Sequence, residues 1–478
     1  METAILFILV LYFCILLLIS WFAGKKNSDN QAFFLANRKS PWYVIAFGMI
    51  GSSISGVTFV SVPGMVSNSS MTYFQMVCGF LAGYLVIAYI LLPLYYRLKL
   101  TSIYTFLEQR FGRYSYKTGA SFFVLSKTVG AAARLYLVVF ILHRLVFSQW
   151  GIHFGFVATG IVALILGYTF RSGIKTIVWT DTVQTLSLIA ALVFICYQIM
   201  QKLDVDFSQV VQTVEQSSYA RIFVFDDWHS TENFWKQFFS GVLIAIVMNG
   251  LDQDMMQKSL TCKTLRDAQK NMVSFGIFYL PVNLLFLSLG AMLILFAAKY
   301  QLVLPTKPDE ILPYIAANYL GFPAVVFFSV GIIAAAFSSA DSALTALTTT
   351  ICIDLLDINR KKAATAVKTR HIVHVSVSLV FLATVLIIHN TGQGSILNTI
   401  YKIASYTYGP LLGMFFFGLF TKINLKDSFV PLVCIMAPIL SFCLEFSLDM
   451  FFHYKVGNEI LLFNGLITVF GLLAISKH

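Results

Sequence analysis

The chain consists of long apolar segments that alternate with short polar loops. A helix needs roughly 20 apolar residues to cross the hydrocarbon core of a bilayer, and these segments approach or exceed that length. The apolar residues form continuous runs, which excludes the strict alternation of a transmembrane β-barrel. The pattern therefore predicts an all-α polytopic membrane protein with about 13 transmembrane helices. The predicted spans lie near residues 3–22, 42–62, 72–96, 118–146, 154–170, 176–199, 234–256, 271–298, 322–356, 371–389, 396–420, 427–447 and 459–476.

The composition agrees with this fold class. Of the 478 residues, 58% are hydrophobic and only 12% are charged, and the mean hydropathy is +0.79, values that a soluble domain does not need. The first span lacks a basic leader and a small-residue cleavage site, so we expect it to be retained as a helix. The seven cysteines are scattered singly through the chain, which argues against a disulfide framework or a metal cluster.

Basic residues gather in alternate loops. They follow the first, third, fifth, seventh and ninth spans, whereas the loops at 61–71 and 390–395 carry none. Under the positive-inside rule this pattern places the N-terminus outside and the C-terminus in the cytoplasm, in a multi-pass protein of the cell inner (cytoplasmic) membrane. The net charge of +11 is thus an orientation signal and does not indicate binding of nucleic acid. The basic residues of these loops are Lys25, Lys26, Arg38, Lys39, Arg97, Lys99, Arg110, Arg113, Lys117, Arg171, Lys175, Lys258, Lys263, Arg266, Lys270, Arg360, Lys361, Lys362, Lys368 and Arg370.

Two of the spans have an interrupted helical pattern. The second reads FGMIGSSISGVTFVSVPG, with glycine and proline around a polar centre, and the seventh carries Asn249-Gly250 midway. Broken helices in corresponding places of two halves point to the binding site of a transporter. We therefore predict two inverted repeats of five helices, spans two to six and seven to eleven. The units are an extra helix and cytoplasmic loop at 1–40, a first repeat at 41–200, a second repeat at 201–420 and two C-terminal helices at 421–478.

The ninth span contains an unusually polar stretch, 331–350, which reads GIIAAAFSSADSALTALTTT. At helical spacing Ser338, Ser342, Thr345 and Thr349 lie along one side, with Asp341 beside them. Hydroxyls and a carboxylate at membrane depth are unfavourable unless they face protein, water or an ion. Oxygen ligands of this kind suit a hard cation such as Na⁺. The alternative is that the small residues only let two helices approach closely.

Two further charged residues lie within predicted spans. Asp181, in the sixth span, is either an acid near the membrane interface or an ion ligand that lines an inner exit path. Arg134, near the middle of the fourth span, needs an anionic partner at that depth. It could form a structural pair with Asp181 or Asp341, or it could bind a substrate carboxylate through two parallel hydrogen bonds. The residues alone leave these alternatives open.

Four motifs, spaced along the chain, resemble the sodium:solute symporter family. They are FFLANRKSPWYVIAFGMIGSSISG near the start, SGIKTIVWTDTVQ in the sixth span, LDQDMMQKSLTCKTLRDAQK after the seventh, and AAAFSSADS in the ninth. The resemblance extends from about residue 30 to residue 420. It implies the inverted-repeat fold shared with the leucine and galactose symporters, in a bacterial member that couples Na⁺ entry to solute uptake.

The resemblance also implies the ligands of a sodium ion. The family's principal sodium site would use the carbonyls of Gly51, Ile54 and Ala335 and the hydroxyls of Ser338 and Ser339. An unwound helix frees carbonyls, and A-x-x-S-S places a carbonyl and two hydroxyls on adjacent turns. Five neutral oxygens suit a monovalent cation better than Ca²⁺ or Mg²⁺.

Some members of the family have a second sodium site. The matching positions here are Asp181, Ser338, Asp341 and Ser342. The family pattern usually has serine where this chain has Asp341. Two carboxylates could bind a second Na⁺ more strongly, or they could share a proton.

The solute is indicated by a smaller set of residues. Where sugar-binding members have Gln and Glu, this chain has Thr58 and Val77, which departs from the galactose pattern. Sialic-acid-transporting members resemble this chain in having an arginine in the place of Arg134, with Ser and Thr matching Ser55 and Thr58. This favours a carboxylated sugar such as sialic acid, or another organic anion, with a neutral sugar or polyol as the alternative. Further expected contacts or gates are Tyr73, Gln75, Asn249 and Gln253.

Other classes of protein fit these observations less well. The sequence has no P-loop, nucleophile elbow or zinc spacing, so an ATP-driven pump is not indicated. A membrane-embedded enzyme would need paired acids or a metal cluster facing one cavity, and a sensor with the same fold would not need intact ion ligands. We therefore predict a sodium-coupled symporter, not an enzyme, that imports a small organic solute by alternating access.

Overall fold

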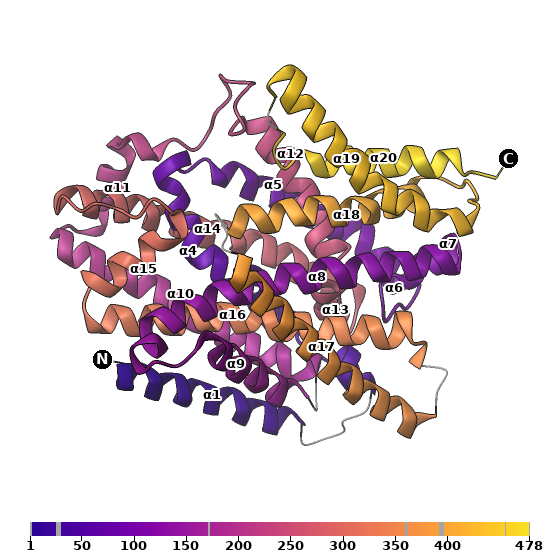
Figure 1. Ribbon diagram of the computed structural model, residues 1–478, viewed down its shortest axis with the longest axis horizontal. Helices are drawn as coiled ribbons and strands as arrows, with labels where there is room; N and C mark the ends of the chain where they lie inside the picture. Colours follow the sequence, from indigo (N-terminus) through magenta and orange to yellow (C-terminus); the bar gives the residue numbers. More distant parts are fainter. Residues whose placement is uncertain are drawn as a thin grey trace.

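The computed structural model describes residues 2–24, 30–170, 173–358, 362–391, 396–454 and 456–477. Within these ranges the regular structure is helical and includes no strand (Figure 1). The long helices and their bent partners are α1 (Glu2–Gly24), α3 (Trp42–Ser53), α4 (Gly56–Ser69), α5 (Tyr73–Val86), α6 (Leu92–Arg97), α8 (Arg113–Leu142), α9 (Phe154–Thr169), α10 (Ile174–Leu203), α12 (Phe234–Ala245), α13 (Gln253–Ser259), α14 (Leu265–Lys299), α16 (Phe322–Thr350), α17 (Ala363–Thr391), α18 (Ile396–Phe420), α19 (Val430–Phe452) and α20 (Ile460–Ala474). Shorter helices are α2 (Asn30–Leu35), α7 (Thr105–Arg110), α11 (Phe207–Gln216) and α15 (Pro308–Asn318).

The predicted spans all fall on these helices. In the described part of the chain, 8 helices are long and apolar enough to cross a membrane, or up to 10 spans if each of two bent pairs is counted as one. Three shorter apolar helices, Leu6–Phe22, Phe154–Thr169 and Ile460–Ala474, coincide with the remaining predicted spans. The all-α polytopic fold is therefore confirmed, whereas the number of helices that cross the bilayer stays a prediction.

Both helices that the sequence marks as interrupted are bent. The axis turns by 61° between α3 and α4 and by 70° between Phe234–Gly250 and α13. Each second half has its own N-terminal cap: Ser55 accepts a hydrogen bond from the Thr58 backbone, and Asp252 accepts one from the Asp254 backbone. Because the cap satisfies a backbone N–H group that has lost its helical partner, the chain can restart the helix in a new direction.

Helix α16 lies at the centre of the packing. Every residue from Gly331 to Thr350 is buried, and the helix packs against α3, α4, α8, α10 and α17. Its hydroxyls and Asp341 therefore face other parts of the protein and not lipid. By contrast, α19 and α20 lie at the edge of the molecule, near the C-terminus (Figure 1).

The two termini lie at opposite ends of the helical bundle in Figure 1. Which end faces the cytoplasm stays a prediction, and Lys25, Lys26, Arg171, Arg360 and Lys361, which contribute to it, lie outside the described residues. The unit boundaries also stay predictions. Those at 40 and 420 fall beside α3 and α18, whereas α10 continues past 200 to Leu203.

Candidate ion and solute site

The break between α3 and α4 releases two backbone carbonyls. In a continuous helix the N–H groups of Ser55 and Thr58 would donate to the carbonyls of Gly51 and Ile54. Here Ser55 N–H donates to the Ser53 carbonyl at 3.1 Å, and Thr58 N–H donates to the Ser55 hydroxyl at 3.4 Å. Both carbonyls that the sequence predicts as sodium ligands thus lose their helical donors.

Helix α16 faces this break with its own predicted ligands. The hydroxyl oxygens of Ser52 and Ser338 lie 3.0 Å apart, which fixes the end of α3 against α16. One residue further along α16, the Ser339 hydroxyl donates to the Ala335 carbonyl at 2.9 Å. Ser339 also lines the same cavity as Ser53 and Ser55. The structure therefore brings the two segments of the predicted sodium site to one junction, and the coordination itself stays a prediction.

Asp181 has a cationic partner that the sequence analysis missed. Its Oδ2 lies 2.8 Å from the Lys258 ammonium, and both side chains are 2% exposed. The Ser338 hydroxyl donates to Asp181 Oδ1 at 2.6 Å, and the Ser52 hydroxyl donates to Oδ2 at 3.0 Å. Asp181 is thus a buried acid at the junction and not an interfacial one.

The position of Lys258 corrects the sequence interpretation. We counted it among the basic residues of a loop, but α13 continues the bent span through Ser259 and carries Lys258 into the core. The signal that could have shown this is the spacing Asp254–Lys258, which places both residues on one face of a helical turn. Arg370 is likewise fully buried, with its guanidinium 2.9 Å from Asn30 Oδ1.

Asp341 lies beside this pair and is incompletely satisfied. The Tyr168 hydroxyl donates to Asp341 Oδ2 at 2.8 Å. Among the residues that the structure describes, Asp341 Oδ1 and the hydroxyls of Ser342 and Thr345 are buried without a hydrogen-bond partner. Buried polar atoms of this kind are normally satisfied, so we expect ordered water to complete their hydrogen bonds.

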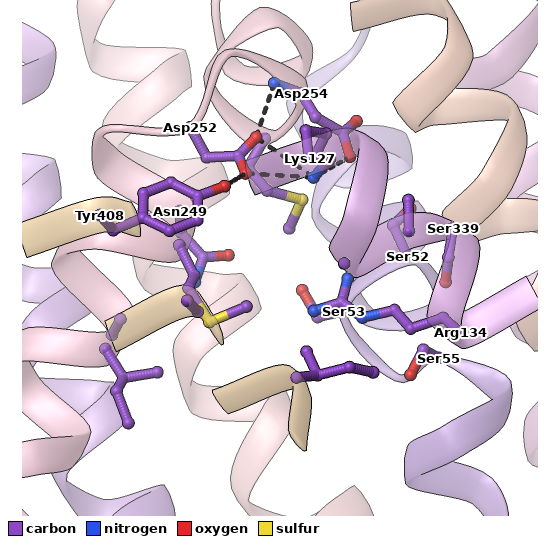
Figure 2. Close-up of a pocket in the computed structure, with 18 of the residues that line it drawn as sticks. Ser52, Ser53, Ser55, Lys127, Arg134, Asn249, Asp252, Asp254, Ser339 and Tyr408 are labelled. Atoms are coloured by element: carbon purple, nitrogen blue, oxygen red, sulfur yellow. Dashed lines mark hydrogen bonds and ion pairs between the residues drawn. The ribbon is translucent and has the colours of Figure 1, made fainter. Parts of the chain in front are cut away.

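A cavity opens next to the junction and contains Arg134. Ser55, Thr58, Asn249 and Ser339 line it together with Arg134. Figure 2 shows Arg134 on one side of the cavity and Asn249 and Tyr408 on the other. Within the described ranges, no hydrogen bond or ion pair engages the guanidinium of Arg134. The two structural partners considered from the sequence are occupied elsewhere, Asp181 by Lys258 and Asp341 by Tyr168.

The cavity also borders a buried charge cluster that the sequence analysis did not find. The Lys127 ammonium lies 3.1 Å from Asp252 Oδ2 and 2.7 Å from Asp254 Oδ2. The Tyr408 hydroxyl donates to Asp252 at 2.6 Å (Figure 2). The three charged residues and Tyr408 all line the cavity. Since the partners come from α8, α13, α18 and the bend before α13, their pairing depends on the tertiary fold.

Three predicted contact residues lie away from this cavity. Gln75 donates to the Glu232 carbonyl and accepts from the Val224 N–H, both at 2.9 Å. Gln253 donates to the Thr101 carbonyl and accepts from the Ile103 N–H, both at 3.0 Å. Each amide therefore holds a loop backbone. Tyr73 lines a separate pocket that includes Glu232, Lys236 and Glu459.

Two bent spans that meet a central polar helix beside a polar cavity are the architecture of a secondary transporter. The chain belongs to the sodium:solute symporter family, whose model matches residues 33–430. The expectations of a sodium-coupled symporter class and of a multi-pass membrane protein are thereby confirmed.

Several characterised proteins are similar to this chain over most of its length. A sodium/sialic acid symporter of Proteus mirabilis is 22% identical, over 96% of this chain and 93% of the relative. One of Aliivibrio fischeri is 23% identical, over 94% of this chain and 89% of the relative. The human sodium/iodide cotransporter is 24% identical, over 83% of this chain and 62% of the relative.

Solved structures confirm the fold. A Na⁺-coupled sialic acid symporter, in a substrate-bound outward-open state, superimposes with a TM-score of 0.84 at 20% identity, covering 100% of this chain and 98% of that one. Mhp1, a nucleobase-cation-symport-1 family transporter, gives a TM-score of 0.59 at 16% identity, covering 92% of each chain. The inverted-repeat transporter fold expected from the sequence is therefore the fold of this chain.

Proposed function

We propose that this protein imports a small carboxylated solute together with Na⁺, with a carboxylated sugar such as sialic acid as the leading candidate. Arg134 carries the proposal. It is a permanently charged guanidinium at the wall of a partly open cavity, and its planar fork matches a carboxylate. Because the carboxylates within the bundle are held by other partners, the solute supplies the anion.

The other residues of the cavity fit a polyhydroxylated solute. Ser55, Thr58 and Asn249 present hydroxyl and amide groups that exchange hydrogen bonds with sugar hydroxyls. The named substrates of these relatives support the anionic class, since sialic acid and iodide are both anions. In this proposal the carboxylate binds Arg134, and the remainder of the solute extends toward Asn249.

Na⁺ binds beside the solute, at the junction of the α3–α4 break with α16. Its ligands are the carbonyls of Gly51, Ile54 and Ala335 and the hydroxyls of Ser338 and Ser339. Occupation of this site fixes the broken helix against α16, and the same break carries Ser55 and Thr58 into the cavity. Coupling follows because the ion favours the state that also binds the solute.

The protein acts as a transporter and not as an enzyme. It lies in the cytoplasmic membrane of a bacterial cell with the N-terminus outside and the C-terminus in the cytoplasm. The distribution of basic loop residues supports this orientation.

Uptake by purified protein in proteoliposomes tests the proposal. An inward Na⁺ gradient should drive accumulation of labelled sialic acid, and replacement of Na⁺ by choline should abolish it. Competition by unlabelled carboxylates, but not by neutral sugars or polyols, would support the anionic class. The reverse pattern would support a neutral sugar or polyol as the solute. Binding without accumulation of any candidate would indicate a non-transporting sensor.

A further inference from the structure

The Lys258 ammonium binds Asp181, one of the four residues expected to hold a second sodium ion. The expected ligands were Asp181, Ser338, Asp341 and Ser342. In the structure the ammonium lies 2.8 Å from Asp181 Oδ2 and donates a hydrogen bond to Ser52. Ser338 donates to the other oxygen of Asp181. A covalently attached cation thus occupies the polar junction between α3, α10, α13 and α16.

The carboxylate of Asp181 is surrounded by hydrogen-bond donors. Both oxygens of Asp181 accept hydrogen bonds, Oδ1 from Ser338 and Oδ2 from Ser52 and Lys258. A sodium ion needs oxygen lone pairs directed toward it, and three of the roughly four lone-pair sites of this carboxylate are already engaged by N–H and O–H groups. Two unit charges about 4 Å apart repel strongly at this depth, which would weaken Na⁺ binding roughly a thousandfold.

Within the group of Asp181, Asp341 and Lys258, the formal charges balance with a single sodium ion. Asp181 and Asp341 supply two negative charges, and Lys258 supplies one positive charge. One Na⁺ bound through Ser338 and Ser339 at the first site would complete the balance.

We propose that the Lys258 ammonium takes the place of a second sodium ion, so that this transporter moves one Na⁺ with each solute molecule. The inference rests on the proposed symport function and concerns only its stoichiometry. Because Lys258 is part of α13, its charge is not transported to the cytoplasm with the solute. Only the ion at the first site then contributes the energy of the sodium gradient to solute accumulation.

Measurement of the wild-type stoichiometry tests this directly. In proteoliposomes, the ratio of ²²Na⁺ to labelled sialic acid taken up should be about one, and the Hill coefficient for Na⁺ should be about one. A ratio and a Hill coefficient near two in the wild-type protein would overturn the proposal. The absence of any sodium-driven uptake would contradict the proposed function instead, so the two failures are distinguishable.

Removal of the Lys258 charge by substitution should create a second sodium site. Lys258→Met keeps an unbranched side chain only one atom shorter than lysine and removes its charge, which leaves Asp181 and Asp341 without the Lys258 cation. We expect the Hill coefficient for Na⁺ to rise to about two in this variant. Lys258→Arg retains a cation and should keep the value near one. The double variant Lys258→Met/Asp181→Asn should return the value to one, because it removes the carboxylate that would bind the additional ion.

A Hill coefficient of one in folded Lys258→Met would show that the missing charge does not open a sodium site, and it would overturn the proposal. Folding is checked by size-exclusion chromatography and thermal unfolding in detergent. If the variant does not fold, the wild-type ratio decides the question.

Discussion

The hydroxyl oxygens of Ser52 and Ser338 lie 3.0 Å apart, although 286 residues separate them in the sequence. This contact joins the end of the first half of a bent span to α16, whose residues from Gly331 to Thr350 are all buried. Each serine also donates to Asp181. A shift of either helix would therefore break several hydrogen bonds at once. An ion bound next to this junction would thus favour one arrangement of the two helices.

We expect Ser339→Ala to raise the Na⁺ concentration for half-maximal uptake by roughly 10- to 100-fold. The variant removes one oxygen ligand, and an interaction of a polar group with a charge contributes about 1.5–3 kcal/mol. Na⁺ titration of solute uptake measures the effect. Ser329→Ala is the matched control, because Ser329 is a buried serine of the same helix that donates only to the Val325 carbonyl at 2.8 Å. Unchanged sodium dependence in Ser339→Ala would refute the assignment of this ligand.

Arg134→Gln should weaken binding of the carboxylated solute by roughly 100-fold or more. It removes the charge and the two parallel hydrogen bonds that a guanidinium gives to a carboxylate. Arg134→Lys should recover part of the affinity, since it restores the charge without the planar fork. Solute-induced thermal stabilisation in saturating Na⁺ measures the change. A variant that loses folding in the absence of solute would instead assign Arg134 a structural role.

Lys127→Met should lower the free energy of unfolding by about 3–5 kcal/mol, because it leaves Asp252 and Asp254 buried without their cation. Lys127→Met/Asp254→Asn should recover part of the loss by removing one of the two unpaired charges. Thermal unfolding in detergent compares the variants. The control is Lys402→Met, which breaks an ion pair with Glu445 through a lysine side chain that is 58% exposed. That change should cost less than about 1 kcal/mol, and equal effects of the two lysine substitutions would contradict the prediction.

Gly241→Ala should destabilise the protein because the new methyl group has no space. A Cβ at Gly241 would lie 2.2 Å from the Met76 carbonyl oxygen, a backbone atom that cannot turn away. Overpacking of this kind typically costs about 1–3 kcal/mol. Gly160 in α9 provides the control, since a Cβ there would meet nothing within 4 Å. Gly160→Ala should raise the melting temperature slightly through helix propensity, and a higher melting temperature for Gly241→Ala would be inconsistent with the packing described here.

The sequence was sufficient to predict the apolar helices, the two bends and the polar face of α16. These features depend on local patterns: continuous apolar runs, glycine and asparagine within a span, and hydroxyls at helical spacing. Ser52, Asp181 and Ser338 could be singled out in the same way, because polar groups within an apolar helix are costly and therefore require a partner.

The partners themselves could not be predicted. Lys258 was interpreted as a loop residue because its charge fits the orientation rule, and only the path of α13 shows that it reaches Asp181. Gln75 and Gln253 were predicted as solute contacts because an amide can donate one hydrogen bond and accept another. In the structure each amide uses this ability to bind one backbone carbonyl and one backbone N–H group. A single sequence does not distinguish a loop backbone from a solute as the recipient of those bonds.

The close contact between Gly79 in α5 and Gly241 in α12 limits how these two helices can move relative to each other. At Gly79 and Gly241 the two backbones approach so closely that an added Cβ would lie 2.1 Å from the Phe238 carbonyl oxygen and 2.2 Å from that of Met76. Surfaces in such close contact have no side chains that could change rotamer to allow sliding. We therefore expect α5, in the first repeat, and α12, in the second repeat, to move as one rigid body. During transport, the hinge lines must lie elsewhere in the bundle.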